Sequence, residues 1–297
     1  MKPFVTETNV LEDVYKICNL PYTQKFLGPQ PISIERKHLK KLNSNYYISN
    51  KCDGLRFLIV ILVINNKPRC VLINRNLQLF LINMSIKKPY YEGSVFDCEL
   101  IINNDNKKEF LFFDCICSRG TPYKALSYSE RIAKCNEFLK ECNPRESDEY
   151  VFSTKQIFHL TDIDSFRKSL NTLNYKHDGY ILMPDNKEII VGTHSTMFKW
   201  KPCYKNTIDF KVDDKLKLYL YKNGELSKTL NKLTFENSML VEDDVKSSIV
   251  ECEFISKRLW KPLQVRKDKN TPNGIFTFNK TLVNIEEDIQ PEEFNLF

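Results

Sequence analysis

The chain has 297 residues, of which 42% are hydrophobic and 28% are charged. A chain of this length corresponds to about two domains of roughly 150 residues with a core each, and its apolar content excludes a disordered chain. The 44 Lys and Arg against 38 Asp and Glu give a net charge of +6. This charge is spread along the chain, so it permits a polyanionic partner without requiring one. The longest apolar run, residues 57–64, is far shorter than a membrane span, and the N-terminus has no signal-peptide core, so we expect neither a membrane-spanning nor a secreted protein.

The ten cysteines and eight glycines exclude several common kinds of site. No Cys-x-x-Cys occurs, and Cys115 and Cys117 alternate within an apolar run with no histidine nearby, so we expect no tetrahedral zinc site. Without a signal peptide, the cysteines of so long a chain are expected to be reduced inside a cell. Neither G-x-G-x-x-G nor G-x-x-x-x-G-K-[ST] occurs, which argues against a dinucleotide-binding fold and a P-loop.

The predicted elements begin with helices and then change to strands. Helical spacing relates Leu11, Val14, Tyr15 and Cys18, and a short helical stretch runs through Leu39 and Leu42. Strands separated by Asn, Pro and Gly turns are predicted at 46–50, 56–64, 69–74, 77–82, 94–102 and 110–117. Sequential hairpins predict a mainly antiparallel sheet. A helix follows Ser129, a second spans 163–173, and strands return at 151–158, 179–183 and 197–200.

Past Asp209 the pattern changes to short strands with tight turns. Strands are predicted at 216–221, 230–235, 248–254 and 263–266, with Asn223-Gly224 as a hairpin turn. These strands predict a small β-barrel of about 75 residues, closed by a helix around 282–289. No Gly/Ser-rich linker occurs, so we expect an α+β protein of two domains, 1–209 and 210–297, with a tight hinge near residue 210.

The strongest local motif is Lys51-Cys52-Asp53-Gly54-Leu55-Arg56, between two predicted strands. The strand period of two places Lys51 and Asp53 on one face, and Gly54 permits a bend that brings Arg56 toward the same cleft. On its own, such a motif is also compatible with a charged turn.

Two pairs of like charges follow this motif, Asp97 with Glu99 and Lys199 with Lys201. Each pair has i, i+2 spacing on one strand, which in isolation is usual for a solvated sheet face. Because like charges repel, the pairs also suit a cleft in which lysines face phosphates and acids face a metal ion, a ribose or Lys51. Arg266-Lys267-Asp268-Lys269 supplies a further cationic group.

Taken together and in this order, the motifs resemble those of the mRNA capping guanylyltransferases of the covalent nucleotidyltransferase superfamily. The likeness is greatest to the compact stand-alone enzymes of large DNA viruses such as the chlorella virus, and it runs from about Leu27 to the C-terminus. It includes residues 28–37, 51–56, 72–75, 93–100, 111–114, 178–181, 198–202, 207–210 and 266–269. The resemblance implies a ligase-type, ATP-grasp-like nucleotidyltransferase domain with antiparallel sheets, followed by an OB-fold domain.

The resemblance also implies a role for each matched residue. Lys51 is the implied nucleophile, which attacks the α-phosphate of GTP to give lysyl-N-linked GMP and pyrophosphate. The other implied GTP contacts are Arg56 and Arg75 to ribose or phosphate, Glu99 to ribose and metal, Phe113 stacked on guanine, Lys155 on the guanine edge, and Asp178, Lys199 and Lys201 on the later motifs. Asp209 is implied as a second metal-site acid, and Arg266, Asp268 and Lys269 as catalytic residues of the OB domain.

The implied cofactor is Mg²⁺ or Mn²⁺, and the implied acceptor is 5′-diphosphate RNA, which receives GMP to form a GpppN cap. The resemblance further implies a separate RNA 5′-triphosphatase, a cap methyltransferase and the transcription machinery as partners, in the nucleus or a viral transcription compartment. The residues suit this chemistry. A free lysine has a pKa of about 10.4 and must lose a proton before it attacks, and a divalent ion stabilises charge on phosphate oxygens. No histidine is needed, and none of the four has a triad-like setting.

Three residues depart from the pattern of the family. Cys98 replaces a usual Gly and is expected to crowd the nucleotide slightly, Asn74 replaces Asp, and Tyr180 replaces Leu. None of these changes removes a charged group of the predicted site.

Two alternatives remain open from the sequence. An ATP-dependent polynucleotide ligase shares the lysine motif, the acidic strand and the Lys-x-Lys strand, but Phe113-Asp114 and the Arg-x-Asp-Lys of residues 266–269 favour capping. An inactive nucleotidyltransferase with a nucleic-acid-binding OB domain is the other alternative. The intact set of charged site residues argues against a loss of activity.

Overall fold

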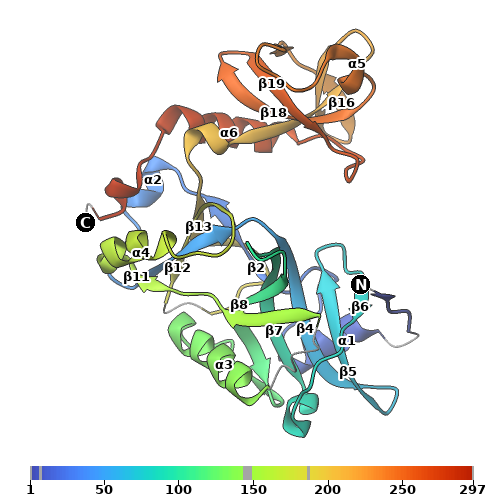
Figure 1. Cartoon of the computed structure of the whole chain (residues 1–297), viewed down its shortest axis with the longest axis vertical. Coiled ribbons are helices and arrows are strands. Elements are labelled where there is room, and N and C mark those ends of the chain that lie inside the picture. The colour runs from blue at the N-terminus through green and yellow to red at the C-terminus, as the bar shows by residue number, and fades with distance from the viewer. Residues whose placement is uncertain (1, 7–8, 143–148, 186–187, 296–297) are drawn as a thin grey trace. The chain divides into compact units, whose positions relative to one another are not determined.

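The computed structural model describes residues 2–6, 9–142, 149–185 and 188–295, which fold into two compact units (Figure 1). The first unit comprises Met1–Ile32 and Lys41–Trp200, and the second comprises Ser33–Lys40 and Lys201–Leu296. The division after Trp200 precedes the expected one at residue 209, because β14 (Thr207–Val212) pairs with β18 (Ile249–Ser256) of the second unit. Within the described residues, the chain crosses between the units after Ile32, after Lys40 and after Trp200.

The larger sheet of the first unit has the strand order β1-β6-β5-β4-β7-β8-β10, with β9 paired to β8. Strand β10 runs parallel to β8, in contrast to the antiparallel pairs of β4 with β5 and β7. Alternate side chains of β4 enter two different apolar clusters, so both faces of this strand are covered. The strands are β1 (Lys2–Pro3), β4 (Leu55–Ile64), β5 (Lys67–Asn74), β6 (Leu79–Leu81), β7 (Ser94–Ile102), β8 (Lys108–Ser118), β9 (Thr121–Pro122) and β10 (Tyr150–Thr154).

The smaller sheet of the first unit has the order β11-β3-β12-β13-β2. Its strands are β2 (Pro29–Ser33), β3 (Tyr46–Cys52), β11 (Phe158–His159), β12 (His177–Pro184) and β13 (Gly192–Trp200). The consecutive strands β3 and β4 lie in different sheets, so Asp53 and Gly54 carry the chain from one sheet to the other. The single sheet expected from sequential hairpins is therefore divided in two, because β3 pairs with the distant strands β11 and β12.

The helices of the first unit are α1 (Val10–Ile17), α3 (Tyr128–Glu141), α4 (Ile163–Leu170) and the 3₁₀ helices η1 (Lys88–Glu92) and η2 (Leu160–Asp162). Helix α3 begins at a capping box, in which the Ser127 hydroxyl accepts from the Glu130 amide and the Glu130 carboxylate accepts from the Ser127 amide. It packs against β8 and β10 (Figure 1) through buried side chains that include Cys135 and Phe138. Within the described ranges, no helix is long and apolar enough to cross a membrane.

The second unit contains a six-stranded sheet of order β16-β15-β14-β18-β19-β17. Besides β14 and β18, its strands are β15 (Leu218–Lys222), β16 (Glu225–Lys228), β17 (Lys232–Leu233) and β19 (Leu259–Val265), and its helices are α2 (Arg36–Leu39), α5 (Glu242–Val245), α6 (Ile275–Glu287), η3 (Cys203–Lys205) and η4 (Pro291–Asn295). Phe210 and Trp260 are fully buried in its core, and α6 covers them with Phe278. This sheet and helix are the small C-terminal β domain that the short strands predicted. Helix α6 begins at Ile275, ahead of the predicted pattern at 282.

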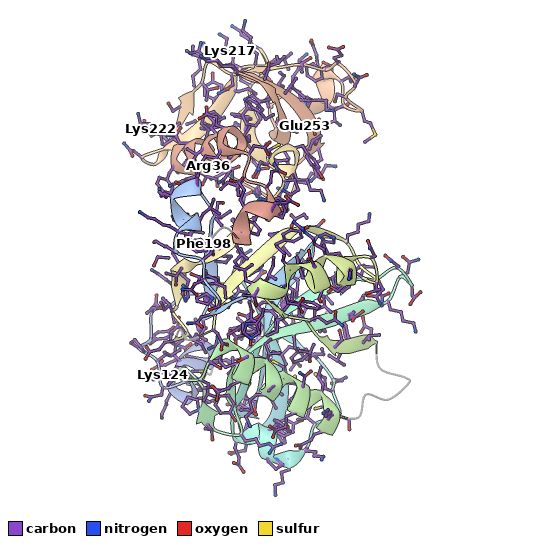
Figure 2. All side chains as sticks on the ribbon, turned by 90° about the vertical axis from the view of Figure 1, so that its left-hand side faces the viewer. Arg36, Lys124, Phe198, Lys217, Lys222 and Glu253 are labelled. Carbon is purple, nitrogen blue, oxygen red and sulfur yellow. The ribbon has the colours of Figure 1, made fainter. Side chains whose placement is uncertain are left out.

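The N-terminal segment Ser33–Lys40 belongs to the second unit through charged contacts with the C-terminal helices. Arg36 (labelled in Figure 2) donates from its backbone amide to a Glu287 carboxylate oxygen at 2.6 Å and pairs with Glu293. Lys280 of α6 pairs with the buried carboxylate of Glu35. These partners are more than 240 residues apart in the sequence, so no local pattern predicts that they meet.

Candidate active site

Lys51 lies near the end of β3, and its Nζ donates to Asp178 Oδ1 at 2.8 Å. Asp178 comes from β12, whose register with β3 shifts between His177 and Gly179, so Asp178 is the extra residue of a β-bulge. A bulge re-aims a side chain, and here it turns the carboxylate toward the lysine. The two side chains are 25% and 19% exposed, so the pair is partly buried and the ammonium is held from the neighbouring strand.

Phe113 is placed by a second bulge. In the pairing of β7 with β8, Asp97 lies opposite Asp114, and Cys98 lies opposite Phe112. Phe113 therefore has no partner in β7 and is the extra residue of the bulge. Its half-buried ring is close to two cations, with Arg56 Cζ at 5.3 Å and Lys155 Nζ at 5.4 Å from the ring centroid. Such contacts hold an aromatic ring in place, and they leave a flat apolar surface beside charged groups.

Arg56, for which the sequence predicts a contact with ribose or phosphate, has a buried guanidinium that makes three hydrogen bonds within the protein. Its Nε and Nη2 donate to the two Asp97 carboxylate oxygens at 2.8 and 2.5 Å, and its Nη1 donates to the Pro29 carbonyl at 2.8 Å. Burial alone would lower the pKa of Arg56, but the Asp97 carboxylate outweighs burial and the pKa is raised. A Cβ on Gly28 would lie 2.4 Å from both Arg56 Nη2 and Asp97 Oδ2, so only glycine fits there. Arg56 thus positions the Gly28–Pro29 backbone and the Phe113 ring.

Glu99 is the carboxylate at the centre of this cluster. Its backbone lies directly opposite that of Arg56 in the pairing of β4 with β7. Burial raises the pKa of Glu99, and the charges of Lys155, Arg56 and Lys51 oppose this increase. Arg75 lies in the exposed turn after β5, where the charges of Arg56 and Glu99 also act on it. One half-buried carboxylate therefore lies within the electrostatic reach of three predicted cations, Lys155, Arg56 and Lys51.

Lys199 lies on the same face of the smaller sheet as Lys51. It is opposite Ile181 of β12, which in turn is opposite Ser49 of β3. Directly opposed residues share a face, and Lys51 follows Ser49 by two residues, so both lysines point to one side. The first unit therefore places Lys199 on the same sheet face as Lys51. It brings together seven other predicted residues: Lys51, Arg56, Arg75, Glu99, Phe113, Lys155 and Asp178.

The three departures from the family pattern have structural explanations. Cys98 was expected to crowd the nucleotide, but its side chain is fully buried in the core on the opposite face of β7 from Glu99, so that expectation is wrong. Asn74 Oδ1 accepts from the amides of Asn76 and Gln78, a turn that needs only an oxygen acceptor. Tyr180 stacks on Trp200 with ring centroids 4.7 Å apart.

The remaining predicted residues form a separate ionic cluster in the second unit. Arg266 donates to both Asp268 oxygens at 2.9 and 2.7 Å, and to Asp209 and Glu251 at 3.3 and 3.4 Å. These hydrogen bonds from Arg266 lower the pKa of Asp268 to about 2. Lys269 pairs with the second oxygen of Asp209. Glu251 lies directly opposite Asp209 in the ladder of β14 with β18, and the sequence analysis did not identify it. Lys201 directly follows β13, is half-buried and belongs to the second unit.

The arrangement of acids limits how a metal ion is held. Asp209 was expected to be a metal-site acid, but both of its carboxylate oxygens are bound by Arg266 and Lys269. Among the residues that the structure describes, no group of three or more His, Cys, Asp or Glu side chains is arranged to hold a metal ion. Mg²⁺ is commonly held by one or two carboxylates together with substrate phosphates. Glu99, which is half-buried and feels the charge of Lys51, fits that kind of site.

The cysteines near the site are expected to react slowly with alkylating agents. Burial raises the pKa of Cys52 and of Cys98, so the reactive thiolate is scarce at pH 7 and increases only as the pH rises toward the raised pKa. Cys203 is half-buried, whereas the other cysteines are buried. Timed treatment with iodoacetamide and peptide mass spectrometry should find Cys203 modified first. Modification of Cys52 ahead of Cys203 at pH 7 would contradict this prediction.

Comparison with known proteins identifies the family. The family model described as mRNA capping enzyme, catalytic domain, matches residues 3–203, and the model described as mRNA capping enzyme, C-terminal domain, matches residues 191–295. The chain is 24% identical to the mRNA-capping enzyme subunit alpha of Schizosaccharomyces pombe, over 90% of this chain and 78% of that protein. It is 28% identical to the protein of the same name from Yarrowia lipolytica, over 93% and 83%.

A solved structure of mycobacterial DNA ligase D complexed with ATP and MES is similar with a TM-score of 0.51 and 13% identity, over 84% of this chain and 97% of that chain. At this level of identity the likeness shows a shared nucleotidyltransferase fold and nothing about the substrate. The two family models, by contrast, together cover almost the whole chain. The chain therefore belongs to the mRNA capping enzyme family, and it is a guanylyltransferase of the nucleotidyltransferase class.

Proposed function

We propose that this protein transfers GMP from GTP, through a covalent adduct on Lys51, to the 5′-diphosphate end of RNA to form a GpppN cap. Membership of the family implies GTP and RNA as substrates and a divalent metal ion as cofactor. The observation that carries the proposal is the cluster around Lys51: its ammonium is held at 2.8 Å by Asp178, and its charge acts on Glu99.

In this proposal the base and the phosphates of GTP contact different parts of the first unit. Guanine stacks on Phe113, and Lys155, which is 7% exposed, hydrogen-bonds to the base edge. Arg75 and Lys199 bind phosphate oxygens as cations. Glu99 holds Mg²⁺ or Mn²⁺, which when bound neutralises the triphosphate and the departing pyrophosphate. The base is thus recognised away from the reacting phosphorus.

The first reaction forms a bond between Lys51 Nζ and the α-phosphorus while the bond to pyrophosphate breaks. Lys51 must lose a proton before it attacks, and Asp178 lies within hydrogen-bond distance to accept that proton. In the second reaction, a β-phosphate oxygen of the RNA end attacks the same phosphorus and Lys51 leaves with a proton. We assign Lys201, Arg266 and Lys269 to the first reaction, as cations at the phosphates that become pyrophosphate, and Asp268 as the acid that orients Arg266. Asp209 holds Arg266 and Lys269 beforehand, and Glu251 also holds Arg266.

The test is incubation with α-labelled GTP, ATP, CTP or UTP and magnesium or manganese, followed by a denaturing gel. Label retained from GTP alone, and then transferred to 5′-diphosphate RNA, is the expected result. Label from ATP alone would indicate a ligase, and no label from any nucleotide would indicate an inactive protein. The same assay with a 5′-triphosphatase and a cap methyltransferase added tests those proposed partners, and imaging tests the proposed nuclear or viral transcription compartment.

Base choice should depend on Phe113 and Lys155 in different ways. Stacking on an aromatic ring contributes about 1–3 kcal/mol per base and tolerates any base, so discrimination must come from an edge contact. Phe113→Ala should raise the KM for GTP roughly 5- to 150-fold. Lys155→Ala should instead narrow the preference for GTP over ATP, measured as the ratio of kcat/KM for adduct formation. An unchanged ratio in Lys155→Ala would show that this lysine does not read the base.

A further inference from the structure

A cavity of about 590 Å³ opens in the first unit next to the lysine motif, and the guanylylation chemistry does not use it. Its lining includes Asp53 and Gly54 from the crossing between the sheets, Lys176 before β12, and Lys108 at the start of β8. The lining does not include Phe113 or Lys155, which we assign to guanine. This volume is in the range of cavities that bind small ligands.

The cavity continues directly from the nucleophile along the strands. Asp53 lies two residues after Lys51, and Lys176 lies two residues before Asp178. Because β3 and β12 are antiparallel, Asp53 and Lys176 are displaced from the Lys51–Asp178 pair in the same direction. Asp53 and Lys176 are joined by a backbone hydrogen bond of 3.2 Å. Ile102 lies three residues after Glu99 on β7 and lines the same cavity as Asp53 and Lys176. Two residues of a strand span about 6.6 Å, so the cavity begins within roughly one nucleotide of the reacting lysine.

The lining has the chemistry of a site for single-stranded nucleic acid. Lys108 and Lys176 are exposed cations, and the apolar side chains of Leu55 and Ile102 are 63% and 64% exposed. Sites for single-stranded nucleic acid combine cations along the phosphate backbone with aromatic side chains on which bases stack. Here the exposed aliphatic side chains of Leu55 and Ile102 offer the apolar surface for a base. Lys108 pairs with Glu149, but both side chains are exposed, and solvent and salt screen an ion pair of this kind. A polyanion can therefore displace Glu149 from Lys108.

One wall of the cavity is held in shape by hydrogen bonds of its own. Asn103 is 5% exposed, and its Oδ1 accepts from the amides of Asp105 and Lys107 at 3.1 and 3.0 Å. Its Nδ2 donates to the buried carboxylate of Glu109 at 3.1 Å. The turn that presents Lys108 is therefore preorganised, which reduces the entropy cost of binding a flexible strand.

We propose that this cavity, defined by Asp53, Gly54, Leu55, Ile102, Lys108 and Lys176, binds the first nucleotides of the acceptor RNA and holds its diphosphate end toward Lys51. The proposal rests on the proposed transfer to RNA, and it assigns the acceptor a place distinct from that of GTP. Lys108 and Lys176 contact backbone phosphates, Leu55 and Ile102 contact a base, and the Asp53 carboxylate accepts from a ribose hydroxyl. Binding of this kind is insensitive to RNA sequence and sensitive to salt.

The test separates the two half-reactions in the full chain. In the double variant Lys108→Ala with Lys176→Ala, adduct formation from GTP and its reversal by pyrophosphate should stay within about twofold of wild type, because neither reaction involves RNA. Transfer from isolated adduct to 5′-diphosphate RNA should fall by about tenfold or more in kcat/KM, mainly through KM, since removal of a lysine that binds a phosphate weakens RNA binding whatever the RNA sequence. The slope of log KM against log salt should fall by about 0.7 for each lysine removed.

Lys107→Ala is the matched control, because this exposed lysine is next to Lys108 and is absent from the described lining of the cavity. It should change transfer less than twofold. Normal adduct formation together with unchanged transfer and an unchanged salt slope in the double variant would overturn the proposal. That result is expected with purified components if the cavity binds a protein partner instead of RNA. A double variant that folds and binds RNA normally but forms no adduct would place the cavity in the GTP site and would also overturn it. Failure of the wild type to form an adduct would instead refute the proposed function.

Discussion

Replacement of Lys51 by Ala or Arg is expected to reduce covalent labelling by α-labelled GTP by at least roughly 10³-fold. Alanine has no nucleophile, and a guanidinium stays protonated at any pH that the protein tolerates. Lysine is also the residue that Asp178 holds at 2.8 Å, so neither replacement keeps the donor in the same place. Labelling on a denaturing gel measures the effect, and the wild-type adduct should be acid-labile and alkali-stable, as a phosphoramidate is.

The control for this result is a lysine on the same unit but away from the cluster. Lys67 lies exposed at the start of β5, and Lys67→Ala should label as the wild type does. Circular dichroism and thermal unfolding establish that the Lys51 variants fold. Retained labelling in a folded Lys51→Ala protein would show that the nucleophile is another residue and would refute the proposed mechanism.

Arg266→Ala or Lys269→Ala is expected to slow adduct formation by roughly 10²-fold or more, as the loss of a cation at developing phosphate charge does. Both side chains are now bound to acids of their own unit, Arg266 by Asp268 and Lys269 by Asp209. We expect these cations to exchange their carboxylate partners for the phosphates of GTP that leave as pyrophosphate. Since pyrophosphate has left before RNA reacts, the second reaction should need them much less.

The decisive measurement for these variants is transfer to 5′-diphosphate RNA from adduct isolated after long incubation with GTP. Transfer at close to the wild-type rate, combined with slow adduct formation, is the expected result. Lys267→Ala is the matched control, because Lys267 is exposed and lies between Arg266 and Asp268 in the same motif. If Arg266→Ala forms adduct normally and fails only at transfer, the C-terminal unit acts on RNA, and the assignment of these residues to pyrophosphate departure is wrong.

Much of the site was predictable because its residues occur in local motifs at strand spacing. The motif at Lys51 falls at the junction of two strands, as predicted, and Glu99 and Lys199 lie within strands as their alternation indicated. The run of β-branched and other apolar residues at 56–64 likewise predicted the strand that became β4 (Leu55–Ile64). These features depend on the two-residue period of a strand, which the residues nearby in the sequence determine.

Other features of the site depend on residues far apart in the sequence, and they follow only from the three-dimensional structure. The bulges that aim Asp178 at Lys51 and free Phe113 from its ladder are mismatches in register between two strands, and neither strand alone contains that information. The burial of Arg56 against Asp97 depends on a carboxylate 41 residues away. Local periodicity states which face of a strand a side chain occupies. The pairing of strands far apart in the sequence decides what that face meets, because long-range packing and hydrogen bonding select one register from many that satisfy the same local pattern.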